Sequence, residues 1–369
     1  MTSYDSYLSN RYFGSLDALR CFAIIGVIWQ HSPAVSHDLM PFANIGASGV
    51  SLFFTISGFL ITTLLLREET KTGTINLKNF YIRRVLRIFP LYYLVLFIYT
   101  VLVFSLEHNA VGSGFFNNLQ YYLTYTSNWF VDLAVNEDGH RRVIFIFAWT
   151  LATEEQFYLF WPIAMKFLQR RKAIAIILIL MLADLSLEFT YFGTLQTPNT
   201  FFERILRIAT SPSTEICCGV LLALALHSKN VFLLLRKVFG RSESAPLLAI
   251  MAITVVMWPG NISAAWYAVQ SIIFCFLLAA CVIREDHSLS WLLKLPLLQR
   301  IGMISYGMYM LHMLAVNISR KAVNSIGLQF NLNSSWIIFL FALLLTIFMA
   351  LISYRYYESL FLKLKENFK

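Results

Sequence analysis

The chain has 369 residues, of which 58% are hydrophobic and 13% are charged, and its formal net charge is +9. A soluble domain carries about 25% charged residues and less than half apolar ones, so this composition excludes a soluble globular protein. The apolar runs at 173–183 and 336–352 are long and unbroken, which favours helices over the alternating strands of a barrel. We therefore predict an all-α polytopic membrane protein.

Ten transmembrane helices follow from counting apolar runs against the roughly 20 residues that a span requires. In chain order they cover residues 15–33, 47–66, 88–106, 145–168, 173–191, 211–227, 245–259, 264–283, 300–318 and 334–356. Of the 29 Lys and Arg residues, 23 fall at the termini or in the even-numbered turns, which predicts cytoplasmic termini. The others are Arg141, Arg142, Arg204, Arg207, Arg320 and Lys321. The net charge is thus a topology signal and does not indicate a nucleic-acid partner.

The first predicted helix carries Arg20 and His31 in the spacing R-x10-H. At 1.5 Å per residue they lie about 16 Å apart along the axis, Arg20 near the cytoplasmic end and His31 toward the outer side. Ionisable side chains inside a bilayer are costly unless paired, so they indicate function. An interfacial histidine is the alternative for His31 taken alone. In the second helix, Gly49, Ser57 and Gly58 are small, and close helix packing is the better interpretation of that segment.

An arginine cluster precedes the third predicted helix and contains Arg83, Arg84 and Arg87. Arg84 and Arg87 are three positions apart and therefore share a helical face at the cytoplasmic surface. One interpretation is contact with lipid headgroups. The other is phosphate capture, since guanidinium groups bind phosphate in a bidentate manner. Coenzyme A carries phosphates and is available on the cytoplasmic side.

Two further helices carry polar side chains at depth. Glu154 and Glu155 are adjacent in the fourth helix and point about 100° apart, so at least one of them must meet a cation, a histidine or a water-filled cavity. Hydrogen bonding between helices is the alternative. In the ninth helix Ser305, Tyr309 and His312 are spaced four and three apart and form a polar stripe on one face. The stripe faces either a cavity or a neighbouring helix.

These motifs occur in the order found in the acyltransferase-3 family of membrane O-acyltransferases, which the chain resembles over residues 16–312. The matching blocks are Arg20-x10-His31, Phe53-Phe54-x-x-Ser57-Gly58-Phe59, Tyr81-x-Arg83-Arg84-x-x-Arg87-Ile88-x-Pro90, Trp149-x-Leu-x-x-Glu154-Glu155-Gln156-Phe157-Tyr158 and Ser305-Tyr306-x-x-Tyr309-x-x-His312. The resemblance implies a multi-pass protein of a bacterial inner membrane, with residues 1–369 forming one transmembrane acyltransferase domain. An additional SGNH hydrolase-like domain, found in some members, is not expected.

The resemblance also implies the reaction, which moves an acyl group, most commonly acetyl, from cytoplasmic acyl-CoA to a hydroxyl of an extracytoplasmic or lipid-linked glycan. His31 and Arg20 match the catalytic motif of the family, and Arg84 and Arg87 match its acyl-CoA motif. We expect His31 to act as base or acyl carrier and one of the two adjacent carboxylates to orient it, with no metal. The predicted substrate cavity consists of Ser57, Ser305, Tyr309 and His312.

Two other classes of protein remain as alternatives. A transporter or flippase would also need intramembrane carboxylates and a polar cavity, but the sequence shows no evident inverted repeat. A purely structural membrane scaffold leaves Arg20, Glu154 and Glu155 unexplained. Binding of acyl-CoA distinguishes the enzyme from both.

Overall fold

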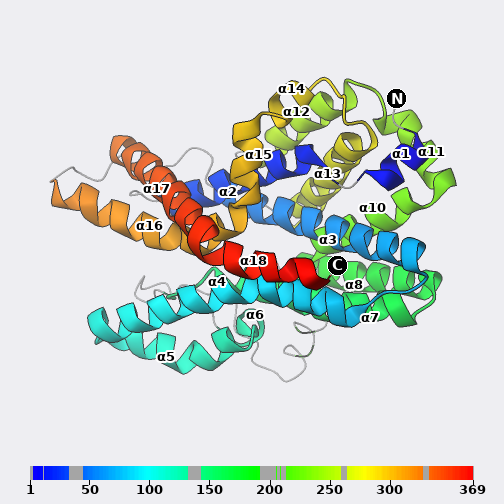
Figure 1. Ribbon diagram of the computed structural model, residues 1–369. Helices are drawn as coiled ribbons and strands as arrows, with labels where there is room; N and C mark the ends of the chain where they lie inside the picture. The colour runs from blue at the N-terminus through cyan, green and yellow to red at the C-terminus, as the bar shows by residue number, and fades with distance from the viewer. Residues whose placement is uncertain are drawn as a thin grey trace. The chain divides into compact units, whose positions relative to one another are not determined.

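The computed structural model describes residues 3–10, 12–32, 45–131, 143–191, 205, 208, 213–258, 264–326 and 332–368. Within these ranges the chain forms helices and no strands (Figure 1), which confirms the predicted all-α class. The chain divides into two compact units. Unit 1 holds Met1–Arg67, Cys218–Ile262 and Trp266–Leu360, and unit 2 holds Glu68–Cys217, Ser263–Ala265 and Phe361–Lys369.

Unit 1 is built from the amino-terminal helices and from helices of the second half of the chain. They are α1 (Tyr4–Ser9), α2 (Gly14–His31), most of α3 (Ile45–Thr72), most of α10 (Thr214–His227), α11 (Lys229–Phe239), α12 (Ser244–Val256), most of α13 (Ala264–Ile283), α14 (Ser290–Leu293), α15 (Pro296–Met303), α16 (Ser305–Ser325), α17 (Leu332–Ser353) and the π-helical turn η2 (Tyr354–Glu358). In Figure 1 α16 and α17, orange to red, run side by side.

Unit 2 is built mainly from the middle of the chain. Its helices are α4 (Leu77–Leu106), α5 (Ala110–Leu123), α6 (Ser127–Phe130), α7 (Ala148–Phe167) and α8 (Arg170–Tyr191), joined by most of α18 (Ser359–Lys365) and the 3-10 turn η3 (Glu366–Phe368).

Each of the ten predicted spans contains a described helix. By length and composition, four of the described helical segments are long and apolar enough to cross a membrane, and two bent helix pairs raise this number to six. The helices α2, α7 and α8 are not among them. The helices therefore fit a multi-pass membrane protein. The number of spans and the side of the termini stay predictions, and Arg141, Arg142, Arg204 and Arg207 lie outside the described residues.

Small residues bring the helices of unit 1 together, as predicted for the second span. A Cβ added to Gly49 of α3 would lie 2.5 Å from the carbonyl oxygen of Ala23 on α2. The approach of α15 to α2 is closer still, since a Cβ on Gly302 would lie 1.8 Å from the carbonyl oxygen of Asp17. At these two contacts only a hydrogen atom separates the backbones, and such contacts are typical of membrane helices, which gain little from hydrophobic burial against each other.

The predicted ninth span is not one straight helix. Its residues divide at Ile304 between α15 and α16, which meet at an angle of 75°. The expectation of a continuous helix over 300–318 is therefore wrong, and Ser305 becomes the first residue of α16. A second bend of 109° separates α10 from α11. The helix α11 lies in the segment 228–244, which is rich in Leu, Phe, Lys and Arg.

An aromatic cluster fixes the core of unit 2. Tyr125 has a positive φ of 53°, a conformation that side-chain-bearing residues rarely adopt. Its ring stacks on that of Tyr92 with centroids 4.2 Å apart, and its carbonyl accepts a hydrogen bond of 2.7 Å from Gln156 Nε2 on α7. The Tyr92 hydroxyl in turn donates to the Tyr122 carbonyl at 2.7 Å.

The helix α4 begins at Leu77, well before the predicted residue 88, so the arginine cluster and the third span form one helix.

A buried histidine of unit 1 gives the protein a predicted dependence on pH. His287 lies in the turn between α13 and α14, is 1% exposed, and places Nε2 3.3 Å from the Ser15 hydroxyl. Burial, with a smaller contribution from Lys294, lowers its pKa to about 4, against about 6.5 in an unfolded chain. Between these values the unfolded chain binds a proton that the folded chain does not. The free energy of unfolding therefore falls with decreasing pH, by at most ~1.4 kcal/mol per unit.

We expect the unfolding temperature in detergent, followed by circular dichroism, to fall as the pH is lowered from 7 to 4.5. The variant His287→Gln keeps a polar side chain without this titration, so its unfolding temperature should change less over the same interval. An equal slope in both proteins would assign the pH dependence to other groups.

Candidate active site

His31 stands at the carboxyl end of α2, where the sequence places the last residue of the R-x10-H motif. Its side chain is half-buried, and its ring lies beside that of His312 with the centroids 5.2 Å apart and the planes tilted by 45°. The two histidines are far apart in the sequence and belong to one unit. The predicted catalytic histidine therefore has a second histidine as its neighbour.

His312 is fully buried on α16, with an exposed fraction of 0%. Its Nδ1 lies 2.6 Å from the carbonyl oxygen of Tyr309, one turn earlier in the helix. A carbonyl only accepts hydrogen bonds, so Nδ1 must carry the proton. In the neutral ring, Nε2 is then the nitrogen with the lone pair.

The remaining residues of the predicted polar stripe are buried with His312. Tyr309 is 8% exposed, and its ring lies 6.4 Å from that of Phe53 on α3. Ser57 is four positions after Phe53, so it lies on the same side of α3, and it is half-buried. Ser305, 6% exposed, begins α16 two turns before His312. The stripe thus contacts α2 through His312 and α3 through Tyr309, and the substrate cavity stays a prediction.

Arg320 is a member of this group that the sequence did not reveal. Its Nη2 donates to the His31 carbonyl oxygen at 2.7 Å and so satisfies a carbonyl at the end of α2. Arg320 was predicted only as an outer-side topology charge. Its spacing of eight from His312 places both on one helix face, and that signal was available.

Arg20 lies in α2 at the opposite end of the R-x10-H motif from His31. Its Nη1 forms an ion pair of 3.0 Å with Asp17 Oδ1, and the side chains are 22% and 9% exposed. The spacing i, i+3 on one helix favours such a pair. Because Gly302 of α15 contacts the Asp17 carbonyl, this ion pair sits where α2 and α15 meet most closely.

The arginine cluster belongs to α4 of unit 2, and its three members differ in their surroundings. Arg83 donates to the Phe368 carbonyl at 2.7 Å and to Glu68 Oε2 at 3.2 Å. The Arg84 guanidinium lies 4.4 Å from the centroid of the Tyr158 ring, a cation–π contact. Arg87 is exposed. Arg83 therefore already binds protein groups. In Arg84 the guanidinium lies over the Tyr158 ring, and its N–H groups, at the edge of the guanidinium plane, are the part that can form hydrogen bonds.

The predicted carboxylates Glu154 and Glu155 lie on α7, also in unit 2, and both are half-buried. Glu155 of α7 lies close enough to Arg84 of α4 for the two charges to interact, and both residues belong to unit 2. The next residue, Gln156, exchanges hydrogen bonds of 2.8 and 2.9 Å with Asn128 of α6. Gln156 therefore has a structural role within the motif that begins at Glu154.

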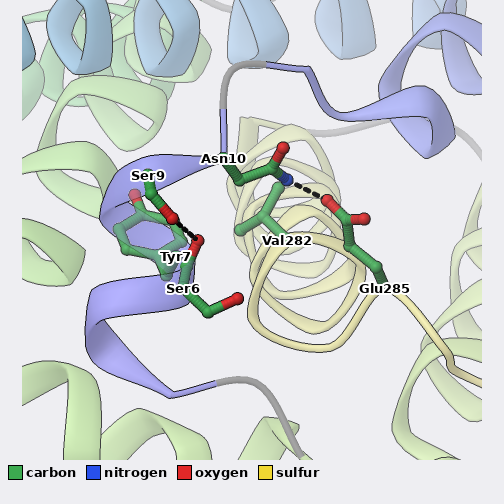
Figure 2. A pocket seen from close by; sticks show the side chains of 6 residues that line it. All are labelled: Ser6, Tyr7, Ser9, Asn10, Val282 and Glu285. Carbon is green, nitrogen blue, oxygen red and sulfur yellow. Dashed lines mark hydrogen bonds between the residues drawn. The ribbon is translucent and has the colours of Figure 1, made fainter.

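A pocket of about 270 Å³ lies elsewhere in unit 1 (Figure 2). It is lined by Ser6, Tyr7, Ser9, Asn10, Val282 and Glu285. Figure 2 shows the Asn10 amide donating to the Glu285 carboxylate across it. Arg67 of α3 donates to the carbonyls of Asn10 and Tyr7. None of the predicted site residues lines this pocket, which lies where the amino-terminal segment packs against α13.

Comparisons with known proteins give a consistent result. A family profile described as "Acyltransferase domain" matches residues 13–355. The O-acetyltransferase OatA of Staphylococcus aureus strain NCTC 8325 / PS 47 is 29% identical over 367 residues, which cover 95% of this chain and 57% of that protein. A putative O-acetyltransferase of S. aureus strain COL is 27% identical over 383 residues, covering 98% of this chain and 59% of that protein. The chain thus spans less than two thirds of the length of these relatives. No solved structure matches it.

Proposed function

Because this chain belongs to the acyltransferase-3 family of membrane O-acyltransferases, we propose that it transfers an acetyl group from cytoplasmic acetyl-CoA to a hydroxyl of an extracytoplasmic or lipid-linked glycan. The relatives named above are described as O-acetyltransferases, which supports acetyl as the acyl group. We propose a bacterial inner membrane as the location, with both termini in the cytoplasm. The transporter alternative gains no support from these relatives.

The observation that carries the proposal is the position of His31. His31 is half-buried at the end of an apolar helix, and its ring lies next to that of a second, fully buried histidine. Histidine titrates near neutral pH, and it is the side chain most often used as a general base. Placement at the carboxyl end of a helix also favours the imidazolium that a base becomes during reaction.

In the proposed reaction the acceptor hydroxyl oxygen attacks the thioester carbonyl carbon while its proton passes to a ring nitrogen of His31. The tetrahedral intermediate then collapses, the carbon–sulfur bond breaks, and the His31 proton passes to the thiolate of CoA. The products are the O-acetyl ester and free CoA thiol, so protons and electrons balance. We propose that three polar side chains bind the acceptor or the oxyanion, because they belong to unit 1, as the two histidines do. They are Ser57 of α3 and Ser305 and Tyr309 of α16.

In unit 2 we propose that Arg84 and Arg87 bind the phosphates of CoA. Arginine binds phosphate through two parallel N–H groups, and contact of Arg84 with the Tyr158 ring holds its plane in one orientation. Arg83 is proposed to act indirectly, since Glu68 and Phe368 engage it. Arg20 and Asp17 are proposed to fix the first half of α2.

The proposal is tested with membrane vesicles that contain the protein, labelled acetyl-CoA and the glycan fraction of the cell envelope. We expect label to enter the glycan and to be released by mild alkali, which cleaves O-acetyl esters and leaves N-acetyl amides intact. Vesicles without the protein are the control. If folded protein transfers no label and binds no acyl-CoA of any chain length, the enzyme is excluded and a transporter becomes the better assignment.

The donor site gives a separate prediction. In purified protein, Arg84→Gln/Arg87→Gln should weaken acetyl-CoA binding by at least about 100-fold, because each lost charged hydrogen bond costs about 1.5–3 kcal/mol. Calorimetry or equilibrium dialysis measures the change. The matched control is Arg171→Gln/Lys172→Gln, which removes the same charge from exposed positions of α8. Equal weakening in both double variants would mean that net charge, and not a specific site, attracts the ligand.

A further inference from the structure

The helix α11 turns away from the direction of α10 and is too short to cross a membrane. It follows α10 after a bend of 109° and spans the 11 residues Lys229–Phe239. At 1.5 Å per residue this helix is about 16 Å long, roughly half the thickness of the hydrocarbon core. Since α10 lies in the predicted sixth span, α11 runs across the direction of that span.

One side of α11 packs against other helices of unit 1. Phe232 is 0% exposed, and its ring centroid lies 5.4 Å from that of Tyr4 and 5.3 Å from that of Tyr7, both on α1. In Figure 1 α1 and α11 lie side by side. At the other end of α11, the ring centroids of Phe239 and Phe276 of α13 are 5.0 Å apart. Contacts at both ends fix the rotation of α11 about its axis, so the directions of its other side chains are determined.

A second apolar stripe of α11 faces away from these contacts. It consists of Val231, Leu234 and Val238, whose spacings of three and four place them on one helix face. Their exposed fractions are 37%, 61% and 59%. In α12, which lies in the predicted seventh span, the outward residues Leu247 and Ile250 are 60% and 61% exposed. The stripe is therefore as open as the side chains of a helix that is expected to contact lipid.

Basic side chains border this stripe. The segment 229–241 contains Lys229, Arg236, Lys237 and Arg241 and no acidic residue. Lys229 and Lys237 are exposed and eight positions apart, so they share one side of the helix. An apolar stripe beside a basic side is typical of an amphipathic helix in the lipid–water interface, where anionic headgroups attract Lys and Arg.

We propose that α11 lies in the membrane surface and binds anionic phospholipids. The side chains of Val231, Leu234 and Val238 enter the acyl-chain region. The ammonium groups of Lys229 and Lys237 bind headgroup phosphates, since a lysine can lay its methylene groups along apolar surface while its charge stays in the polar layer. A second copy of this chain fits the stripe less well, because a two-fold contact would bring the lysines of both copies together.

Spin labelling of the protein in nanodiscs of phosphatidylcholine and phosphatidylglycerol tests the position of the stripe. Labels at Leu234→Cys and Val238→Cys are expected to collide more often with oxygen, which dissolves in acyl chains, than with a water-soluble nickel complex. A label at Lys229→Cys, roughly 140° and 180° around the helix from these two, should show the reverse. Protein without an added cysteine gives the background of the native cysteines, of which four are buried and Cys275 is half-buried.

Lipid selectivity is the second readout. In native mass spectrometry of detergent-purified protein, we expect phosphatidylglycerol to bind more tightly than phosphatidylcholine. Lys229→Gln/Lys237→Gln should weaken phosphatidylglycerol binding at least about five-fold, since one basic residue near an anionic lipid surface contributes a factor of about five. The matched control is Lys71→Gln/Lys78→Gln, which removes two exposed lysines from the adjoining ends of α3 and α4. Its phosphatidylglycerol binding should stay within about two-fold of wild type.

The possible outcomes are distinct. Labels at positions 234 and 238 that collide more often with the nickel complex than with oxygen would overturn the lipid contact. Protection of these labels from both reagents would also overturn it, and dipolar coupling between labels would then identify a second copy of the chain on the stripe. Equal affinity of wild type for the two lipids, or equal losses in the two double variants, would overturn the binding of headgroup phosphates by α11.

Discussion

Replacing His31 by Gln is expected to reduce acetyl transfer about 10²–10⁴-fold, the usual range for loss of a positioned general base. Gln keeps a polar side chain at the end of α2 but cannot take a proton. The backbone carbonyl of residue 31 still accepts from Arg320, so the local packing of α2 and α16 should persist. The measurement is the rate of alkali-labile label incorporation into envelope glycan.

The specificity of this loss is checked in two ways. Acetyl-CoA binding should stay within about two-fold of wild type, because the proposed phosphate site is built from Arg84 and Arg87 and a two-fold change is below 0.5 kcal/mol. The matched control is His227→Gln, since His227 is also the last residue of an apolar helix in unit 1, α10. Full transfer by His31→Gln would remove His31 from the chemistry.

Replacing Gly302 by Ala is expected to cause a larger loss of stability than any other substitution proposed for this protein. An alanine Cβ would lie 1.8 Å from the carbonyl oxygen of Asp17, a backbone atom that no change of rotamer moves away. Real Cβ contacts are longer than about 3 Å, so α15 and α2 would have to separate by more than 1 Å along their contact. We expect a cost of about 3 kcal/mol or more, as for other overpacked sites.

The measurement is the temperature at which detergent-solubilised protein loses its monodisperse elution peak. The loss in Gly302→Ala should be at least about 5 °C, given that a destabilisation of 1 kcal/mol shifts Tm by roughly 2–4 °C in chains of moderate size. Gly114→Ala is the matched control, because Gly114 lies within α5 and a Cβ there meets nothing within 4 Å. Its stability should be unchanged or higher, since Ala favours a helix over Gly by about 1 kcal/mol. Equal Tm values for the two variants would contradict the close packing of α15 on α2.

Most of the secondary structure could be predicted from the sequence. Apolar runs specify helices directly, because a backbone in lipid must satisfy its hydrogen bonds within the segment. The bends between consecutive helices were harder to predict. Gly302 and Gly307 flank Ile304, but membrane helices tolerate glycine, so these residues did not predict that α15 and α16 meet there at 75°. The bend lies next to the contact between Gly302 and Asp17, two residues that are far apart in the sequence.

The candidate site was predicted residue by residue but not as an arrangement. The cost of ionisable groups in a bilayer identified Arg20, His31, Glu154 and Glu155. It did not identify their partners. Arg20 pairs with Asp17 on its own helix, and Glu155 interacts with Arg84. Partners within one helix follow from i, i+3 spacing, whereas partners on different helices depend on helix rotation and depth.

The sequence by itself determined that this chain is a helical membrane protein of one family and which side chains are too polar to face lipid. Hydrophobic run length and the electrostatic cost of buried charge act locally, so both can be read along the chain. Only the tertiary structure decided that His31 lies against His312, and that a carbonyl fixes which His312 nitrogen carries the proton. Those relations depend on how α2 and α16 pack, and packing is set by shape complementarity among residues distant in sequence.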